Sequence, residues 1–145
     1  MRDIIPEFQG KIVTSVSSAP AAGVEASLTM PARVRWRVKT VSFSLTTSGG
    51  AGNRVPHLRI RQDGITVWRS NPANLQTSTQ TVEYRFGSGL GVDRAVVTEY
   101  DQQSFPVDML LNKEAIIDTA ASALLGGDQF TGITVLVEEW QEPIV

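Results

Sequence analysis

The sequence has 145 residues, carries 13 basic and 15 acidic side chains, and contains no cysteine. A chain of this length is expected to form one domain that buries about two thirds of its unfolded surface. The lack of cysteine excludes disulfides, thiolate zinc sites and thiol redox chemistry. No window approaches the roughly 20 apolar residues of a membrane span. Residues 1–5 also lack the apolar core of a secretory signal, so we expect a soluble protein.

Residues 1–32 differ from the rest of the chain. A strand candidate at 8–16 is followed by a segment rich in Ser, Ala and Pro at 15–32. Its small side chains offer little volume to a core, so this segment is predicted either to be a surface loop or to lie along a neighbouring molecule. We therefore divide the chain into an N-terminal arm, or first strand plus loop, at 1–32 and a single β-sandwich domain at 33–145.

Apolar and polar side chains alternate over residues 33–46, the period of a half-buried strand. The apolar positions are first even and then odd: Val34, Trp36, Val38, Val41, Phe43 and Leu45. A one-residue slip would turn every following side chain to the other face. We therefore expect a β-bulge or bend near Lys39 and Thr40.

A hairpin is predicted over residues 58–70, because Asp63-Gly64 between two alternating runs is typical of a type I′ turn. With Gln62 opposite Ile65, the expected pairs are Ile60 with Val67 on the inner side and Arg59 with Trp68 on the outer side.

Further strands are predicted at 81–86, 95–100, 107–111, 114–120 and 130–140. The alanines of residues 114–125 would tolerate a helix, but we favour a strand for the first half of that segment. Eight or nine short strands joined by glycine-rich or polar turns indicate an all-β fold. The expected architecture is an antiparallel β-sandwich, jelly-roll-like, with an extended N-terminal segment.

Charge is unevenly distributed along the chain. Residues 33–69 contain eight basic side chains and one acidic one, whereas residues 99–145 contain nine acidic side chains and one basic one. We expect basic and acidic strands to neutralise one another within one sheet. The alternative is that the two sets meet across subunits or on a partner, since complementary charge fixes register and partner choice.

No catalytic constellation is visible. The only imidazole is His57, which we expect to be half-exposed on a strand. Glu138 and Glu139 are adjacent, so on a strand they point to opposite faces and do not converge as an acid and a base. The aspartates lack calcium-loop spacing. We therefore expect no enzymatic activity, no metal and no cofactor.

A basic strip can follow nucleic-acid phosphates, but stacking aromatics should then share its face, and Trp36 points the other way. Direct nucleic-acid binding is therefore disfavoured. Exposed Trp68, Tyr100 or Trp140 would suit either a sugar platform or a subunit contact, and we favour the contact. The candidate partner-binding residues are those of one expected sheet surface and its tryptophan: Arg33, Arg35, Arg37, Arg59 and Trp68.

A series of strand and turn motifs runs through residues 34–140. They are Trp36-Arg37, Val41-Ser42-Phe43-Ser44-Leu45-Thr46-Thr47, Gly52-Asn53-Arg54, Leu58-Arg59-Ile60, Val67-Trp68-Arg69-Ser70, Gly127-Asp128-Gln129-Phe130 and Val135-Leu136-Val137-Glu138-Glu139-Trp140. In this order the motifs resemble small virion proteins of tailed bacteriophages, among which are capsid decoration, or cement, proteins.

The resemblance implies a non-enzymatic virion structural protein, commonly a homotrimer, that binds and stabilises the lattice of the major capsid protein or contacts other virion proteins. It implies a place on the outer capsid surface, and in the host cytoplasm during assembly. The alternative function is a glycan-binding or adhesion module associated with a tail, neck or fibre.

Overall fold

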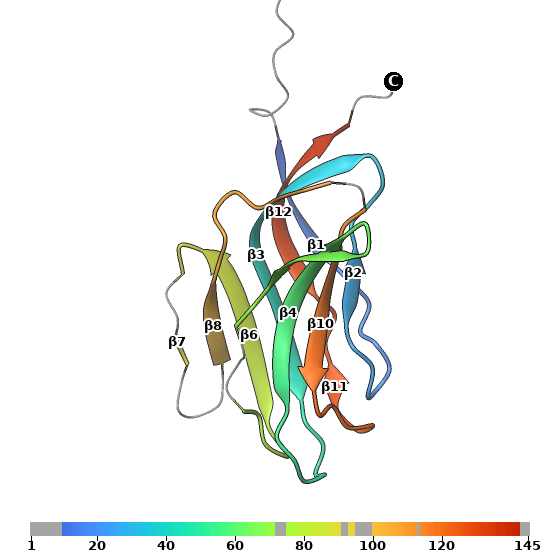
Figure 1. The fold of residues 1–145 in the computed structure, drawn as a ribbon, viewed down its shortest axis with the longest axis vertical. Coiled ribbons are helices and arrows are strands. Elements are labelled where there is room, and N and C mark those ends of the chain that lie inside the picture. Colours follow the sequence, from blue (N-terminus) through green and yellow to red (C-terminus); the bar gives the residue numbers. More distant parts are fainter. Residues whose placement is uncertain (1–9, 72–74, 91–92, 95–99, 113, 143–145) are drawn as a thin grey trace, which may run out of the picture.

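Two β-sheets packed face to face make up the part of the chain that the computed structural model describes, residues 10–71, 75–90, 93–94, 100–112 and 114–142 (Figure 1). The first sheet has the strand order β1 (Lys11–Val16), β12 (Thr134–Gln141), β3 (Val34–Thr46), β6 (Thr81–Ser88), β8 (Tyr100–Phe105) and β7 (Asp93–Arg94), and β9 (Leu110–Leu111) and β11 (Gln129–Phe130) also pair with β3. The second sheet has the order β2 (Ser27–Thr29), β10 (Ile116–Ser122), β4 (Val55–Gln62) and β5 (Ile65–Arg69).

The predicted all-β sandwich is thus confirmed, and the strands of the described residues pair antiparallel apart from one pair. β6 and β8 run parallel, from Glu83 opposite Tyr100 to Ser88 opposite Phe105. Parallel neighbours need a connection that returns to the starting end of the sheet. Here β7 lies on that connection and pairs antiparallel with β8. Most of the strand predicted at 95–100 falls outside the described residues, and β8 begins at Tyr100.

The predicted bulge in β3 is confirmed. Leu136 of β12 lies opposite Thr40, but the next residue, Val137, lies opposite Val38, so Lys39 is the extra residue. Val38 and Val41 are both buried on the core side. The extra residue therefore lets one continuous strand of 13 residues keep its apolar side chains inward on both sides of a phase change.

The β4–β5 hairpin has the predicted turn but not the predicted register. Asp63 and Gly64 have φ angles of 51° and 77°, as a type I′ turn requires. Ile60 lies opposite Trp68, however, and Arg59 lies opposite Arg69, because the register shifts and leaves Val67 as an extra residue. The pairings of Ile60 with Val67 and of Arg59 with Trp68 were therefore wrong.

Residues 10–32 contribute a strand to each sheet: β1 pairs with β12, and β2 pairs with β10. Ala26, Leu28 and Met30 are buried. The strand candidate at 8–16 is thus confirmed as β1 within the described residues, whereas the surface loop predicted over 15–32 is wrong at residues 26–30. The short run Ser27–Thr29 alternates exposed and buried side chains, and three residues suffice to place Leu28 in the core.

The strand predictions at 81–86 and in the first half of 114–125 are confirmed, and those at 107–111 and 130–140 are confirmed in part. Val82, Tyr84 and Phe86 point inward from β6, and residues 116–122 form strand β10 rather than a helix. Residues 107–111 contain a turn and the two-residue strand β9. Residues 130–140 divide between β11 and β12.

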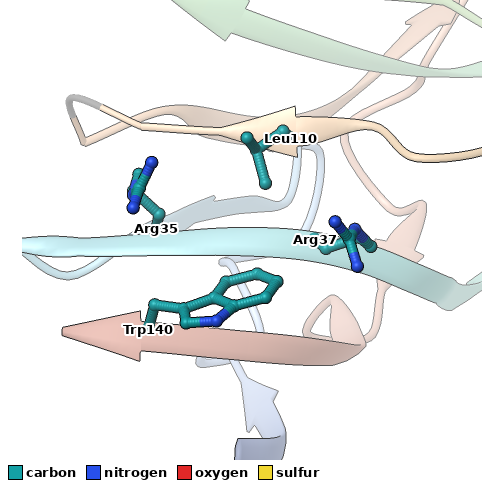
Figure 2. A pocket seen from close by; sticks show the side chains of 4 residues that line it. All are labelled: Arg35, Arg37, Leu110 and Trp140. Atoms are coloured by element: carbon teal, nitrogen blue, oxygen red, sulfur yellow. The ribbon is translucent and has the colours of Figure 1, made fainter. Parts of the chain in front are cut away.

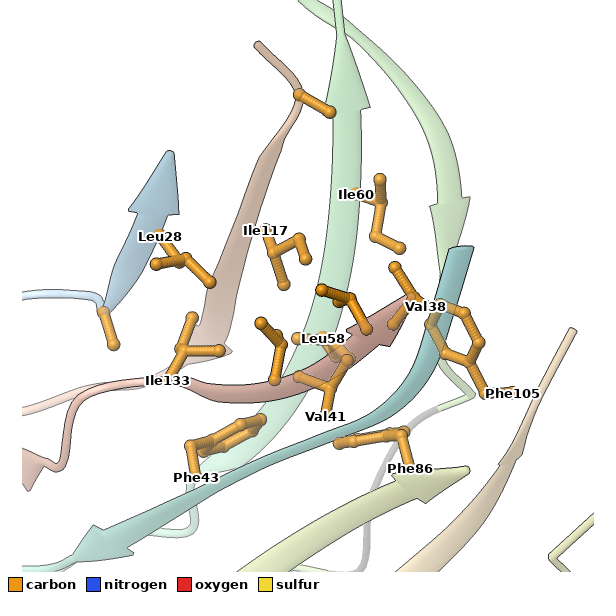
Figure 3. Packing of buried hydrophobic residues seen from close by; sticks show 14 of the residues in the cluster. Leu28, Val38, Val41, Phe43, Leu58, Ile60, Phe86, Phe105, Ile117 and Ile133 are labelled. Atoms are coloured by element: carbon orange, nitrogen blue, oxygen red, sulfur yellow. The ribbon is translucent and has the colours of Figure 1, made fainter. Parts of the chain in front are cut away.

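The core lies between the sheets, where side chains from both layers point toward one another (Figure 3). The ring of Phe43 stacks on Tyr84 at a centroid distance of 5.1 Å and on Phe86 at 6.0 Å. Burial raises the pKa of the Tyr84 phenol, whose hydroxyl donates to Gln76 Oε1 at 2.8 Å. Gln76 in turn donates to the Leu45 carbonyl at 2.7 Å, so this buried polar chain is paired at each step.

A buried ion pair fixes the loops at one end of the sandwich. The guanidinium of Arg54 donates to both carboxylate oxygens of Asp128, from Nε at 2.8 Å and from Nη2 at 2.9 Å, and both side chains are fully buried. Arg54 also donates to the carbonyls of Gly50 and Gly52. Burial alone would raise the pKa of Asp128, but hydrogen bonds from Arg54, Leu125 and Ser48 hold it well below its usual range.

Candidate partner-binding site

The predicted partner-binding residues lie on both sheets. Arg35 and Arg37 lie within β3 of the eight-stranded sheet, and Arg33 directly precedes this strand. Arg59 lies on β4 and Trp68 on β5, both in the four-stranded sheet. The expectation that they share one sheet surface is therefore wrong. Strand order is a long-range property, and the spacing of apolar residues along the chain does not determine it.

Trp68 does not stand on the outer surface. Its ring lies 4.8 Å from Phe105 and 6.3 Å from Phe86, measured between centroids, and it packs against the core. The bulge at Val67 is the cause, because it turns Trp68 inward and leaves Val67 49% exposed. The structure gives Trp68 a packing role.

Arg35 and Arg37 do come together, around a recess of about 100 Å³ on the outer face of the eight-stranded sheet. Figure 2 shows both side chains extending from β3, with Leu110 on one flank and the indole of Trp140 on the other. The register explains this set, because Arg35 lies opposite Trp140 of β12 and Arg37 lies opposite Leu110 of β9. We call these four side chains the arginine recess.

The arginine recess combines apolar and cationic surface. The guanidinium carbon of Arg37 lies 5.1 Å from the centroid of the Trp140 ring, a cation–π distance. Trp140 is only 4% exposed, whereas Leu110 is 45% exposed. Sequence analysis missed Leu110, because only its pairing with β3 places it beside the arginines.

The two arginines of the recess differ in their partners. Arg37 Nη1 donates to Glu138 at 3.3 Å, and its Nε lies 3.5 Å from a carboxylate oxygen of Asp108. Arg35 has neither a hydrogen bond nor an ion pair with any residue that the structure describes. Among the described residues, the recess therefore holds one arginine without an acidic partner, next to an exposed apolar side chain.

Arg33 lies at the same end of β3. It is exposed and adopts a left-handed backbone with a φ of 60°. Its carbonyl accepts the Glu142 N–H at 2.8 Å, which fixes the residue that follows β12 against the residue that precedes β3.

Arg59 belongs to a second cationic cluster, on the outer face of the four-stranded sheet. Arg59 and Arg61 both bond the nearly buried carboxylate of Asp118, at 2.8 and 2.7 Å. The hydrogen bond to Asp118 raises the pKa of Arg59. Arg69 lies directly opposite Arg59 across β4 and β5. Two cations thus face each other across the strands, beside a single carboxylate.

Ion pairs between strands of the same sheet join the basic and acidic segments of the chain. Arg37 pairs with Glu138 within the eight-stranded sheet, and Arg59 pairs with Asp118 within the four-stranded sheet. The prediction that basic and acidic strands neutralise one another within a sheet is confirmed for these pairs. Arg37 and Arg59 are thus held by acids of their own sheet, whereas Arg35 has no such partner among the described residues.

His57 is 8% exposed, so the expectation of a half-exposed histidine is wrong. Its Nδ1 lies 3.3 Å from the carbonyl oxygen of Ser70, the residue that follows β5. The described residues contain no group of three or more histidine or carboxylate side chains placed to hold a metal. They also contain no helix with the length and hydropathy needed to cross a membrane.

A shallower hollow of about 310 Å³ lies further along the outer face of the eight-stranded sheet. Its lining is rich in hydroxyl groups and has one acid: Ser42, Ser44, Thr131, Thr134 and Glu83. Such a surface offers hydrogen-bond donors and acceptors and little charge.

Comparisons with known proteins assign no family to this sequence. No protein-family model matches the sequence, and no curated protein matches it. Among solved structures, a chain of infectious bursal disease virus, Gx strain, is 12% identical, and the match covers 92% of this chain and 39% of that one with a TM-score of 0.28. A TM-score this low carries no argument about fold or function.

Proposed function

We propose that the protein is a non-enzymatic structural protein of a virion, and that it decorates a tailed-phage capsid by docking onto the major capsid protein through the arginine recess. The observation that carries this proposal is the recess itself, where Arg35, which pairs with no acid in the part of the chain that the structure describes, lies beside an exposed leucine and a buried tryptophan. Arginine and aromatic side chains are enriched at the centres of protein interfaces.

The charge of the recess defines the chemistry of the surface it fits. Arg35 lacks an acidic partner among the described residues, and Leu110 offers apolar area within the same recess. The complementary surface carries a carboxylate next to an aliphatic side chain. A carboxylate held by a guanidinium and shielded by apolar contact forms a stronger pair than one in open solvent.

The resemblance to small virion proteins supplies the biological setting of the proposal, and the rigid two-sheet body suits a structural role. The homotrimer that the resemblance implies stays a prediction. So does the location on the outer capsid surface.

Co-sedimentation with undecorated capsids tests the proposal. Arg35→Glu should reduce the bound fraction at low salt, because it places a carboxylate against the acidic partner surface, and the loss should shrink at high salt. Arg69→Glu is the matched control, since it makes the same charge change on the exposed surface of the other sheet. Equal binding by both variants and the unaltered protein would refute docking through the recess.

The hydroxyl-lined hollow favours a second candidate function, a glycan-binding module of a tail, neck or fibre. Neutral sugars are recognised by hydroxyl and carboxylate groups such as those of Ser42, Ser44 and Glu83. A glycan-array measurement separates the two functions. Binding that Ser44→Val abolishes and Arg35→Glu leaves intact would support adhesion over decoration.

A further inference from the structure

β1 is the outermost strand of the eight-stranded sheet. Among the residues that the structure describes, it pairs with β12 alone. An edge strand presents a row of unpaired backbone groups and is a template for pairing with another chain. Native edges are often protected by charge or proline, but β1 instead exposes Ile12 and Val16, at 61% and 63%.

The backbone directions in β1 follow from its contact with β12. The Ser17 N–H donates to the Ile133 carbonyl at 2.9 Å, and Ser17 is the residue that follows β1. In an antiparallel ladder, successive residues direct their N–H and C=O groups to opposite edges. Ile12, Thr14 and Val16 therefore direct these groups to the open edge. Their side chains are also the exposed ones on the outer face.

We propose that β1 pairs antiparallel with β1 of a second copy of this chain, about a two-fold axis at Thr14. In that register Ile12 lies opposite the partner's Val16, and Val16 lies opposite the partner's Ile12. The two-fold axis thus creates two equivalent contacts between Ile12 of one copy and Val16 of the other. Both contacts lie on the same face of the joined sheet and cover the apolar side chains that β1 exposes. The backbone groups of the same residues complete the ladder.

Neighbouring registers do not have this property. A two-fold axis at Val13 would place Ile12 opposite Thr14 and Val16 opposite Gly10, and an axis at Ser15 would place Val16 opposite Thr14. Only the axis at Thr14 pairs the two exposed aliphatic residues with each other. It also places Lys11, the one charge of β1, opposite the partner's Ser17, so no like charges meet.

A two-fold contact of this kind closes after two copies. The inference is therefore distinct from the trimer that the resemblance implies, and it does not depend on capsid binding. It predicts a particle in solution with twice the 15.7 kDa mass of the chain.

Cysteine cross-linking tests the register. The chain has no cysteine, so Thr14→Cys introduces a single thiol. Directly opposite residues of a hydrogen-bonded antiparallel pair have Cα atoms about 5.5 Å apart, within the range that a disulfide spans. Under mild oxidation this variant should form a covalent dimer in high yield. Thr66→Cys, exposed on the edge strand of the other sheet, is the control and should remain largely uncross-linked.

Sedimentation measurements test the contact independently. Val16→Lys should convert the dimer to a monomer, because it places a charge opposite Ile12 of the second copy. Val107→Lys makes the same change at a residue that is 72% exposed and should leave the dimer intact. Circular dichroism verifies that both variants fold. A monomeric or trimeric unaltered protein, a Val16→Lys variant that stays dimeric, or equal cross-linking of the two cysteine variants would overturn the inference.

Discussion

The buried pair of Arg54 and Asp128 gives the sharpest stability prediction. Asp128→Asn keeps the size of the side chain and removes its charge, so the fully buried guanidinium loses its counter-ion. The carboxylate accepts from Arg54 Nε and Nη2, from the Ser48 N–H and hydroxyl, and from the Leu125 N–H, at 2.8–3.1 Å. Asparagine has an NH2 group in place of one carboxylate oxygen. Some of the N–H and O–H groups that donate to Asp128 would therefore face another donor and lose their hydrogen bond.

Breaking a buried ion pair by removing one partner costs about 3–5 kcal/mol, against a typical domain stability of about 5–15 kcal/mol. For a chain of this size that corresponds to a fall in the melting temperature of about 6–20 °C. Differential scanning calorimetry and urea unfolding, with the m-value monitored, measure both quantities. The exposed pair of Glu83 and Arg85 is the control, since Glu83→Gln should cost only about 0–1 kcal/mol.

The pH dependence provides a second readout of the same pair. The folded-state pKa of Asp128 is depressed, so its contribution is fully present above the unfolded-state pKa of about 3.9 and is lost as the pH falls toward the folded value. The unaltered protein should therefore lose stability in acid more steeply than Asp128→Asn. An Asp128→Asn variant whose stability lies within about 1 kcal/mol of that of the unaltered protein, with the same loss of stability in acid, would refute this account.

Two further predictions concern packing. Trp68→Ala should destabilise the protein by about 3–5 kcal/mol in urea unfolding, because Trp68 packs on the core, whereas Val67→Ala, at 49% exposure, should cost less than about 0.5 kcal/mol. Equal effects would mean that the inward position of Trp68 is wrong. Gly132→Ala should strongly lower the melting temperature, since its new Cβ would overlap the Ser17 carbonyl oxygen. Gly49→Ala, whose Cβ would meet nothing within 4 Å, should be nearly neutral by the same assay.

Local patterns predicted much of the sandwich. The alternation in β3 predicted a bulge or bend near Lys39 and Thr40, because a strand with one buried face must correct any phase change within a residue or two, and the structure makes Lys39 the extra residue. The Asp63-Gly64 turn was predicted for a similarly local reason, the need for two residues with positive φ. The burial of Leu28 was not predicted, since a strand of three residues is too short to show a period.

The candidate site was predicted only in part, because its residues meet through pairings distant in sequence. Arg35 and Arg37 were proposed from their parity, but Leu110 joins them through a two-residue strand that carries no signal of its own. Trp68 was misplaced by one extra residue in β5, which reverses the face of every side chain after it. The turn type sets the register next to the turn and does not specify a bulge further on.

The described chain begins and ends beside the arginine recess, which affects how the protein should be handled in the laboratory. A Cβ on Gly10 would lie 2.9 Å from the Trp140 ring, and the Glu142 N–H bonds the Arg33 carbonyl, so both ends emerge at this corner (Figure 1). A bulky group attached at Gly10 or Glu142 would therefore crowd the arginine recess. The loop between β3 and β4 lies at the opposite end of the sandwich (Figure 1). Its Gly50 and Gly52 carbonyls bond Arg54, but a Cβ on Gly49 would meet nothing within 4 Å, so Gly49 is the better place to attach a label.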